Sequence, residues 1–531
     1  MGAGLQTTVT GPTYDPDAQL FFNAQTGAGV TLTTTQMNAV NQWVVDSKAA
    51  NIWTKFKAIY PFVGSTATSQ KFNLKNPLDT NAAFRLSFIG GGTHSANGYQ
   101  PNGINSYANT FLNSGVDLTN TNNHISYYSR TATVGVVVEM GTYDGATSSF
   151  FQVRTAANYI SGNVSNAISY TTTGSALGFW LGTKRSNTDR EVYRNGVSET
   201  TNTTSDSLAL PNILIYLGAR NSVNYIPPGA QLFSSKELAF STIGDGLTDL
   251  ESQLFYQITE KYQVALSRNI NTTQSFYYNS AYNNETNAFL FSTQITNATI
   301  QTATNTLVAD LKTAGVFTKM KALYPMVGGT ATTCKFNLIN PQDSDAAYRL
   351  NFVGGWTPSA NGMTPNGVNA YANTFLSSSI MALNSGHLSY YSRTNNTSNG
   401  VEIGALRPSP DSYSDLSLRN SNQTYFRFNN SATYNQITAV NTDGYFIGTR
   451  TAVNIIKTFK NGSIIINGTA LSSSTSPITF FLAAHNNNGT AITFSNRQCA
   501  LSSIGDGLTD AEALALYNAV NAFQITLARN V

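Results

Sequence analysis

The chain has 531 residues and a formal net charge of +3 at pH 7, and charged residues make up only 11% of it. This length exceeds that of one ordinary domain and suits two or more. Without a run of Lys or Arg, the sequence argues against nucleic-acid binding, which rests on clustered cations. No apolar run approaches the roughly 18 residues that a membrane span needs, so we expect no membrane partner either.

The chain begins with "MGAGLQTTVTGPTYDPDAQ", in which no basic segment precedes an apolar core. A secretory signal peptide needs both parts, so none is predicted. We therefore expect the protein to accumulate in the cytoplasm of the cell that makes it. A surface rich in Thr, Ser, Asn and Gly is typical of adhesins, lectins and viral shells rather than of cytosolic enzymes.

The second half of the chain repeats the first. The segments 52–113 and 316–377 align without a gap, and shorter matches continue to the end of each copy. Insertions and deletions fall between the matched blocks, as expected for surface loops on a shared scaffold. We expect two tandem copies of one domain, divided as follows: an N-terminal extension at 1–30, copy 1 at 31–270, a linker with aromatic anchors at 271–292, and copy 2 at 293–531.

Each copy is expected to open with a pair of helical segments. Thr33 in copy 1 and Asn297 in copy 2 are the predicted N-caps of the first helix, because their short polar side chains accept hydrogen bonds from free backbone N–H groups. A second, short amphipathic turn is predicted at 53–59 and 317–323. A proline follows two residues later in both copies and ends the turn.

Each copy is expected to close with a helix after a Gly-Asp-Gly turn. Thr248 takes the N-cap position and Glu251 lies three residues on, and Thr509 and Glu512 repeat the pattern. The Thr oxygen accepts from the third backbone N–H while the Glu side chain reaches back to the cap. Apolar residues then recur at helical spacing, so the helix lies on another element.

Between these helices the pattern is that of short β-strands. Segments such as "HISYYSRT" and "HLSYYSRT" alternate polar and apolar residues, and Asn-Gly pairs mark the turns. Strands without interleaved helices predict a mainly β fold. We expect two tandem antiparallel domains, each a jelly roll or β-sandwich of about 200 residues between its N-terminal helices and its closing helix.

Several segments carry a resemblance to known families. "LGTKRSNTDREVYRNG", "IGTRTAVNIIKTFKNG", "LPNILIYLGARN" and "PITFFLAAHNN", with the "GLTDAEALALY" helix, resemble the closing half of a concanavalin A-like or laminin-G-like lectin sandwich. The "IGDGLTD" ending and the block "YPFVGSTATSQKFNLKNP" are similar to repeated domains in structural proteins, fibres or appendages, of tailed phages of Bacteroidetes-type hosts. The likeness covers almost the whole chain and implies a place in a virion.

Catalytic chemistry finds little support in the sequence. Glycoside hydrolysis needs two carboxylates about 5–9.5 Å apart across a cleft, whereas the acid that matches between the copies is a lone one, Glu139 or Glu402. Asp144 has no partner in the second copy. Of the four histidines only His124 and His387 match, and at the start of a strand a histidine with a bonded nitrogen is favoured over a general base.

No cofactor or metal is predicted. Ca²⁺ stays an alternative, because lectin-like sandwiches bind it through Asp and backbone oxygens, but no motif supports it. The two cysteines, Cys334 and Cys499, correspond to Gln70 and Leu238 in copy 1, so the architecture does not require a disulfide. Two buried thiols are the favoured interpretation, with a bridge or a metal pair as alternatives.

The best candidate for binding is the loop "SANGYQPNGINSYANTF" and its echo in copy 2. Amide side chains both donate and accept, and a Tyr ring offers a flat apolar face, which is how sugars are often held. The favoured interpretation is nevertheless that the loop residues shape turns and that the loop packs on the neighbouring copy or on another subunit. The weak candidates for a glycan site or an interface are Tyr99, Asn102, Tyr107, Trp356, Asn366 and Tyr371.

These observations favour a non-enzymatic virion protein, displayed as a fibre, appendage or capsid decoration. Its expected partners are other virion proteins and further copies of itself in a homo-oligomer. The alternative function is a receptor-binding adhesin that recognises host surface polysaccharide. A polysaccharide-degrading enzyme using Glu139 or Glu402 is the third hypothesis.

Overall fold

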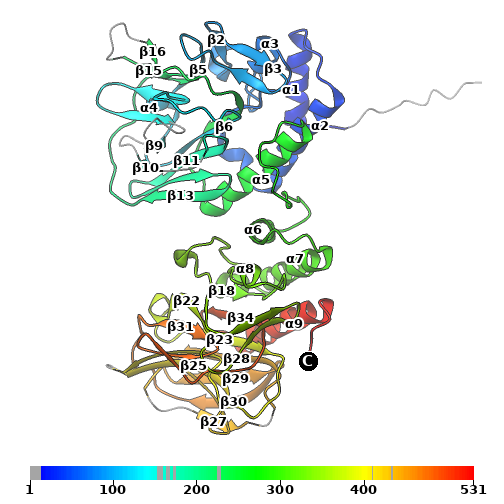
Figure 1. Ribbon diagram of the computed structural model, residues 1–531, viewed down its shortest axis with the longest axis vertical. Coiled ribbons are helices and arrows are strands. Elements are labelled where there is room, and N and C mark those ends of the chain that lie inside the picture. The colour runs from blue at the N-terminus through cyan, green and yellow to red at the C-terminus, as the bar shows by residue number, and fades with distance from the viewer. Residues whose placement is uncertain are drawn as a thin grey trace, which may run out of the picture. The chain divides into compact units, whose positions relative to one another are not determined.

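The computed structural model describes residues 13–151, 159–162, 168–171, 175–223, 229–408, 411–431, 435–439 and 441–531. The chain divides into two compact units, Met1–Ser280 and Ala281–Val531 (Figure 1). Each unit contains two large, mainly antiparallel β-sheets together with helices. The predicted fold class, a mainly β chain of tandem β-sandwich domains, is therefore confirmed.

The long helices of unit 1 are α1 (Pro16–Gly27), α2 (Thr34–Ala49) and α5 (Asp249–Ala265), and α3 (Ala67–Gln70) and α4 (Ser114–Asp117) are single turns. Thr33 caps α2 as predicted, in a capping box with Gln36. The predicted box of Thr248 and Glu251 opens α5. The helix α1 lies within the predicted extension, where Asp15 caps it and Pro16 fixes its first φ angle.

The predicted second helical segment of each copy is wrong. Residues 53–59 form a 3-10 turn, η1 (Trp53–Lys55), and then enter strand β1 (Phe56–Tyr60). Strand β1 pairs antiparallel with β17 (Leu238–Gly244). A segment this short gains little from helical hydrogen bonds, so an available sheet edge decides its structure.

The first sheet of unit 1 has the order β13-β12-β11-β6-β17-β4-β3, with β1 beside β17. Its central strand β6 contains residues 124–129 of the predicted strand segment "HISYYSRT". The remaining strands are β3 (Thr93–Ser95), β4 (Gly98–Gln100), β6 (Asn123–Ser129), β11 (Gly178–Ser186), β12 (Asp189–Arg194) and β13 (Val197–Asn202).

The second sheet of unit 1 has the order β16-β15-β7-β14-β5-β2, with β8 beside β7. Only the pairing of β15 with β7 is parallel among the pairings described for this sheet. A separate hairpin is formed by β9 (Tyr159–Gly162) and β10 (Ile168–Thr171). The sheet strands are β2 (Ser87–Ile89), β5 (Tyr107–Asn113), β7 (Met140–Tyr143), β8 (Ser148–Phe151), β14 (Leu214–Leu217), β15 (Arg220–Ser222) and β16 (Gly229–Gln231). The short 3-10 turn η2 (Asn81–Ala83) precedes β2.

Successive side chains of β6 point alternately to the core between the sheets and to the outer helix α5. Tyr127 belongs to the core cluster that both sheets line, whereas the neighbouring Tyr128 points the other way and donates to Glu260 on α5. Successive side chains of a strand face opposite sides, so α5 covers the outer face of the first sheet. Phe255 of α5 packs edge-to-face on Phe179 of β11, with ring centroids 4.9 Å apart.

Unit 2 repeats this plan with α7 (Ala298–Thr313) and α9 (Asp510–Thr526) in the places of α2 and α5. Asn297 caps α7, and Thr509 and Glu512 form the predicted capping box of α9. The helix α6 (Asn284–Thr293) lies, except for its last residue, in the segment 271–292 that the sequence assigns to a linker. The short helical turns are η3 (Phe317–Lys319), α8 (Ala331–Cys334), η4 (Asp345–Ala347) and η5 (Ser378–Ile380).

The two sheets of unit 2 have the orders β20-β21-β34-β23-β28-β29-β30, with β18 beside β34, and β19-β22-β31-β24-β25-β26-β27, with β32 and β33 attached to β24. The first sheet comprises β18 (Met320–Tyr324), β20 (Trp356–Ser359), β21 (Gly362–Pro365), β23 (Gly386–Ser392), β28 (Gly444–Ala452), β29 (Ile455–Lys460), β30 (Ser463–Thr469) and β34 (Cys499–Gly505). The second comprises β19 (Asn351–Val353), β22 (Tyr371–Ser377), β24 (Ile403–Pro408), β25 (Asp411–Asn420), β26 (Gln423–Asn430), β27 (Asn435–Thr438), β31 (Thr479–Leu482), β32 (His485–Asn487) and β33 (Thr490–Ile492).

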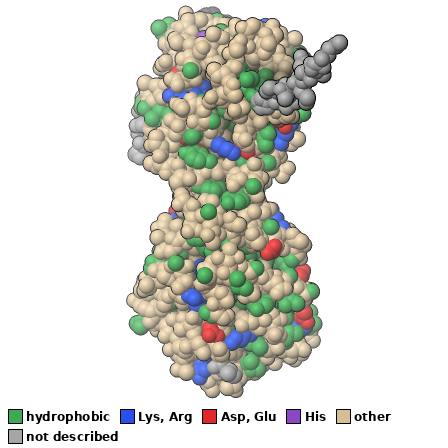
Figure 2. All heavy atoms as spheres, turned by 90° about the vertical axis from the view of Figure 1, so that its right-hand side faces the viewer, with side chains coloured by type: hydrophobic (Ala, Val, Ile, Leu, Met, Phe, Trp, Pro, Cys, Tyr) green, Lys and Arg blue, Asp and Glu red, His purple; other side chains and the backbone are tan. Residues whose placement is uncertain are grey.

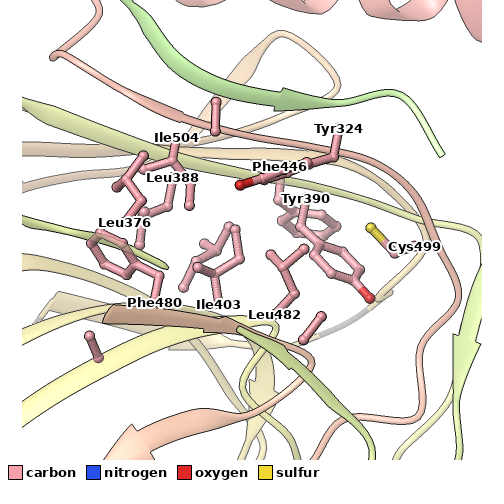
Figure 3. Close-up of a cluster of buried hydrophobic side chains, with 14 of the residues drawn as sticks. Tyr324, Leu376, Leu388, Tyr390, Ile403, Phe446, Phe480, Leu482, Cys499 and Ile504 are labelled. Atoms are coloured by element: carbon pink, nitrogen blue, oxygen red, sulfur yellow. The ribbon is translucent and has the colours of Figure 1, made fainter. Parts of the chain in front are cut away.

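The core of unit 2 lies between its two sheets (Figure 3). Leu388 and Ile504 come from the first sheet, and Ile403 and Leu482 come from the second. All four side chains are 0% exposed, and full burial of each stabilises the unit by roughly 1.5–3 kcal/mol relative to exposure.

Charged side chains are sparse on the face that Figure 2 presents. Figure 2 shows Lys, Arg, Asp and Glu side chains scattered among uncharged ones on the face that it presents. Within the described ranges, no helix is both long enough and apolar enough to cross a membrane.

Candidate functional site

The candidate loop of unit 1 runs from β4 to β5, and the sequence proposed Tyr99 as one of its contact residues. Tyr99 is 1% exposed, because it stands on β4 with its ring tilted 4.8 Å from that of Phe88. Burial raises its pKa to about 12. The prediction that Tyr99 offers its ring to a glycan is corrected: strand alternation directs this ring into the core of the sandwich.

Asn102 holds the loop together from within. Its Oδ1 accepts from the backbone N–H groups of Ile104 at 2.9 Å, Asn105 at 3.0 Å and Ser106 at 3.1 Å. Its Nδ2 donates to Asn105 Oδ1 at 2.8 Å. This is the chemistry by which Asn shapes turns, and it leaves little of the amide for a ligand.

Unit 2 repeats this arrangement at Asn366. Its Oδ1 accepts from the N–H groups of Val368, Asn369 and Ala370 at 2.9, 3.1 and 3.2 Å, and its Nδ2 donates to Asn369 Oδ1 at 2.8 Å. Two copies that have diverged elsewhere keep the same amide in the same role, so this amide fixes the turn in both.

The remaining aromatic candidates are half-buried. Tyr107 stacks on Tyr216 with ring centroids 4.5 Å apart, and Tyr371 stacks on Phe481 at 4.4 Å. Each stacked pair covers one face of the tyrosine ring. Trp356 packs edge-to-face on Phe352, and its Nε1 lies 3.1 Å from both Val353 O and Tyr371 O, to which it donates. The structure thus brings Trp356 and Tyr371 together, at the edge of the sandwich.

The matched acid of unit 1, Glu139, is buried in an ion pair. Its Oε1 accepts from Lys236 Nζ at 2.7 Å and from Ser234 Oγ at 3.2 Å. Both charged side chains are almost completely inaccessible, with exposures of 0% and 1%. A catalytic carboxylate must reach a substrate directly or through one water, and Glu139 is enclosed.

The acid of unit 2, Glu402, is enclosed in the same way but with a different base. Its Oε1 accepts from Arg497 Nη1 at 2.8 Å and from Ser495 Oγ at 2.8 Å. Its Oε2 accepts from the backbone N–H of Leu418 at 2.7 Å. Every partner belongs to the protein, so the carboxylate is satisfied without a ligand.

The matched histidines are structural, as the sequence analysis favoured. His124 Nδ1 lies 2.5 Å from Asp245 O and its Nε2 lies 2.9 Å from Thr242 Oγ1. His387 makes the same two contacts, to Asp506 O at 2.7 Å and to Ser503 Oγ at 3.1 Å. Both rings are fully buried, and burial lowers the pKa of each to about 4. Both are therefore neutral at pH 7.

Both cysteines are buried free thiols, which confirms the favoured interpretation over a bridge. Burial raises the pKa of Cys334 to about 11 and that of Cys499 further above its usual range. Thiols of this kind are poor nucleophiles at neutral pH. Among the residues that the structure describes, no group of three or more His, Cys, Asp or Glu side chains is placed to hold a metal ion.

One polar cluster was not predicted from the sequence. On the second sheet of unit 2, Arg427 makes a bidentate pair with the 0% exposed Asp415, and Arg427 also lies over the ring of Tyr413 at 4.1 Å. His485 Nε2 is 3.8 Å from Asp415 Oδ2, and burial lowers the pKa of His485. The three residues come from separate strands, so no local spacing in the sequence could have revealed them.

A second missed group is Glu260 of α5. Its Oε2 accepts from Tyr128 OH at 2.8 Å, and its side chain is fully buried. Burial raises the pKa of Glu260 to about 7. The corresponding residue of unit 2 is Asn521, so comparison of the two copies was the signal that could have found it.

Comparison with known proteins gives likenesses of fold. No protein-family model matches the chain, and no curated protein matches it. It is similar to domain 4 of an extracellular GH43 arabinanase from Geobacillus stearothermophilus in complex with arabinotriose, at 13% identity over 37% of this chain and 98% of that one, with a TM-score of 0.26.

The chain is also similar to parts of two larger structures. The botulinum neurotoxin serotype D binding domain is 9% identical over 38% of this chain and 52% of that one, with a TM-score of 0.26. A Trypanosoma rangeli sialidase mutant with trans-sialidase activity is 10% identical over 65% of this chain and 49% of that one, with a TM-score of 0.33. The chain thus spans about half the length of these two structures.

Proposed function

We propose that the protein is a non-enzymatic structural component of a tailed-phage virion, a fibre, appendage or capsid decoration. The observation that carries the non-enzymatic part is the fate of the side chains that match between the copies. Glu139 and Glu402 are enclosed in ion pairs, and Asn102 and Asn366 bond their own loops. These four side chains therefore serve the scaffold.

The virion part of the proposal rests on the sequence resemblance to phage structural proteins. The low content of charged residues, 11% of the chain, and the two compact sandwich units also suit a protein that works by assembling with others. Its expected partners are other virion proteins and further copies of itself.

Co-purification with particles tests this function. Particles from a lysed host culture are separated from free protein on a density gradient, and each fraction is probed with an antiserum against the recombinant chain. We expect the protein to band with the particles at a constant ratio to the major capsid protein. Recovery only from the particle-free fractions would contradict the proposal.

A second candidate function is adhesion to host surface polysaccharide. It is favoured by the stacked pairs Tyr107–Tyr216 and Tyr371–Phe481, which place a half-buried tyrosine at the same point of both units. Binding of the labelled protein to intact host cells, with soluble capsule polysaccharide as competitor, tests it. Binding that the polysaccharide competes away, and that Tyr107→Ala and Tyr371→Ala together remove, would establish adhesion. Absence of binding to the cells, or binding that the competitor does not reduce, would exclude it.

A further inference from the structure

The outer side of α9 in unit 2 exposes an uncharged, partly apolar strip. Leu514 is 46% exposed and Ile525 is 55% exposed. Asn518 and Ala522 are exposed between them, and Tyr517 is half-buried beside them. Positions three or four apart lie on the same side of a helix, so these five residues form one surface, called the α9 face below.

The corresponding helix of unit 1 holds a segment of chain along the equivalent face. Asn271 Nδ2 donates to Tyr256 OH at 2.9 Å. Further along, Lys261 Nζ donates to Tyr278 O at 3.1 Å. The segment 271–278, "NTTQSFYY", is therefore laid out beside α5, and it contains no charged residue.

The start of this arrangement is the same in both units. In unit 1 the N–H of Ile270 donates to Tyr128 OH at 3.1 Å, and in unit 2 the N–H of Val531 donates to Tyr391 OH at 3.0 Å. Tyr517 of α9 corresponds to Tyr256 of α5, whose hydroxyl accepts the hydrogen bond from Asn271. The α9 face thus keeps the tyrosine with which α5 holds its segment.

The differences between the two faces indicate the chemistry of the partner. Glu260 and Lys261 of α5 are replaced by Asn521 and Ala522 on α9, and the buried Gln253 is replaced by the exposed Leu514. A charged partner would lose hydration on this face without gaining a counter-charge. Aromatic and aliphatic side chains would instead bury apolar area against Leu514 and Ile525.

We propose that the α9 face is a docking site for an uncharged segment with Asn, Thr and aromatic side chains, supplied by a neighbouring subunit. The segment would lie across α9 as residues 271–278 lie across α5 between Tyr256 and Lys261. The aromatic residues at the positions of Phe276 and Tyr278 would anchor it. This inference rests on the proposed function, because it supplies one contact by which the protein would assemble.

A synthetic peptide of the chain's own residues 271–280, "NTTQSFYYNS", is the probe. Labelled peptide is titrated with the full-length protein, in which the segment already bound to α5 leaves the α9 face as the open site. Fluorescence anisotropy should show saturable binding of one peptide per chain. Ile525→Asp should weaken binding at least tenfold, and a peptide with Phe276→Ala and Tyr278→Ala should bind equally weakly.

The matched control is Val264→Asp, which changes the position of α5 that corresponds to Ile525 and is 38% exposed. It should leave peptide binding unchanged, and circular dichroism should show both variants folded. Absence of saturable binding, or equal weakening by both variants, would overturn the proposal. Self-association that Ile525→Asp removes, without any peptide binding, would also overturn it, since the face would then be a contact between whole copies. Co-purification with particles is measured independently, so it can succeed where this inference fails.

Discussion

The two units share a fold and differ in how they use charge. Unit 1 buries Glu139 with a lysine, and unit 2 buries the equivalent Glu402 with an arginine. Lysine presents a point charge, whereas arginine presents a planar fork, and the two are not interchangeable where geometry decides chemistry. The exchange is tolerated here because the base only has to neutralise a buried acid. Both units therefore keep a buried acid with a neutralising base in the core, whereas the identity of the base changes.

The outer helices show the opposite trend. On α5, Lys261 donates to Tyr278 in a segment of the unit's own chain and the nearby Glu260 accepts from Tyr128. On α9 the neutral residues Asn521 and Ala522 take both places. Buried partners constrain a helix face, whereas an open face is free to change its chemistry. The exposed face of α9 therefore lacks the two charges that unit 1 keeps on α5.

The largest expected effect comes from breaking the buried ion pair of unit 2. Arg497→Met leaves Glu402 in the core without its counter-charge and should destabilise unit 2 by about 3–5 kcal/mol. The double variant with Glu402→Leu should recover most of this loss, because an apolar pair avoids the desolvation cost. Hydrogen exchange followed by mass spectrometry reports each unit separately, and unit 1 is the internal control. A loss shared equally by both units would contradict this assignment.

The next largest effect is a pH dependence of the stability of unit 1 that unit 2 lacks, because α5 carries Glu260 where α9 carries Asn521. Glu260 has a pKa raised to about 7, against an ordinary value of 4.5, so the folded state binds its proton more tightly than the unfolded state. Its favourable contribution is complete below about pH 4.5 and is lost as pH rises through 7. Glu260→Gln should remove this dependence, on the order of 1–3 kcal/mol, from unit 1 only.

Hydrogen exchange of α5 at pH 5 and pH 8 measures the effect of Glu260. Unit 2 carries Asn521 at this position and provides the matched control. An unchanged pH dependence in Glu260→Gln would show that another group is responsible.

The buried histidines should act in the opposite direction and in both units. His124 and His387 have pKa values lowered to about 4 from 6.5, so stability is complete above about pH 6.5 and is lost as pH falls towards 4. In unit 1 the gain from Glu260 partly offsets this loss, whereas unit 2 has no such offset from Asn521. Acid unfolding should therefore begin in unit 2, and hydrogen exchange between pH 4 and 6.5 should show it.

The smallest effect concerns the loop amides. Asn102→Ala and Asn366→Ala each remove an acceptor for three backbone N–H groups. Because the loop is partly exposed and water can replace the amide, each unit should lose about 1 kcal/mol. Similar losses in the two units are expected from chemical denaturation followed by hydrogen exchange. A loss near zero in either unit would show that its loop does not need the amide.

Much of the scaffold was predictable because its signals are local. The capping boxes at Thr248 and Thr509 and the alternation of β6 and β23 are visible within a few residues. The segment 53–59 was not, because its pairing partner β17 lies far along the chain. A helical pattern of so few residues carries too little free energy to resist a sheet edge.

The candidate site was predictable only in part, for a related reason. The sequence singled out Glu139 and Glu402 but could not place Lys236 or Arg497 beside them, since each partner is distant in the chain. Tyr99 sits in a loop-like stretch of turn residues, and only the pairing of β4 with β17 shows that its ring faces the core. Local patterns identify which residues match, and tertiary contacts decide whether they are accessible.

The most direct test of the virion assignment is electron microscopy of intact particles labelled with gold-conjugated antibodies against the full-length protein. We predict gold at a fixed structural position on the particles, whether head, tail or appendage. Particles that carry no gold above the level of a non-immune serum, while the free protein in the same lysate is labelled, would contradict it.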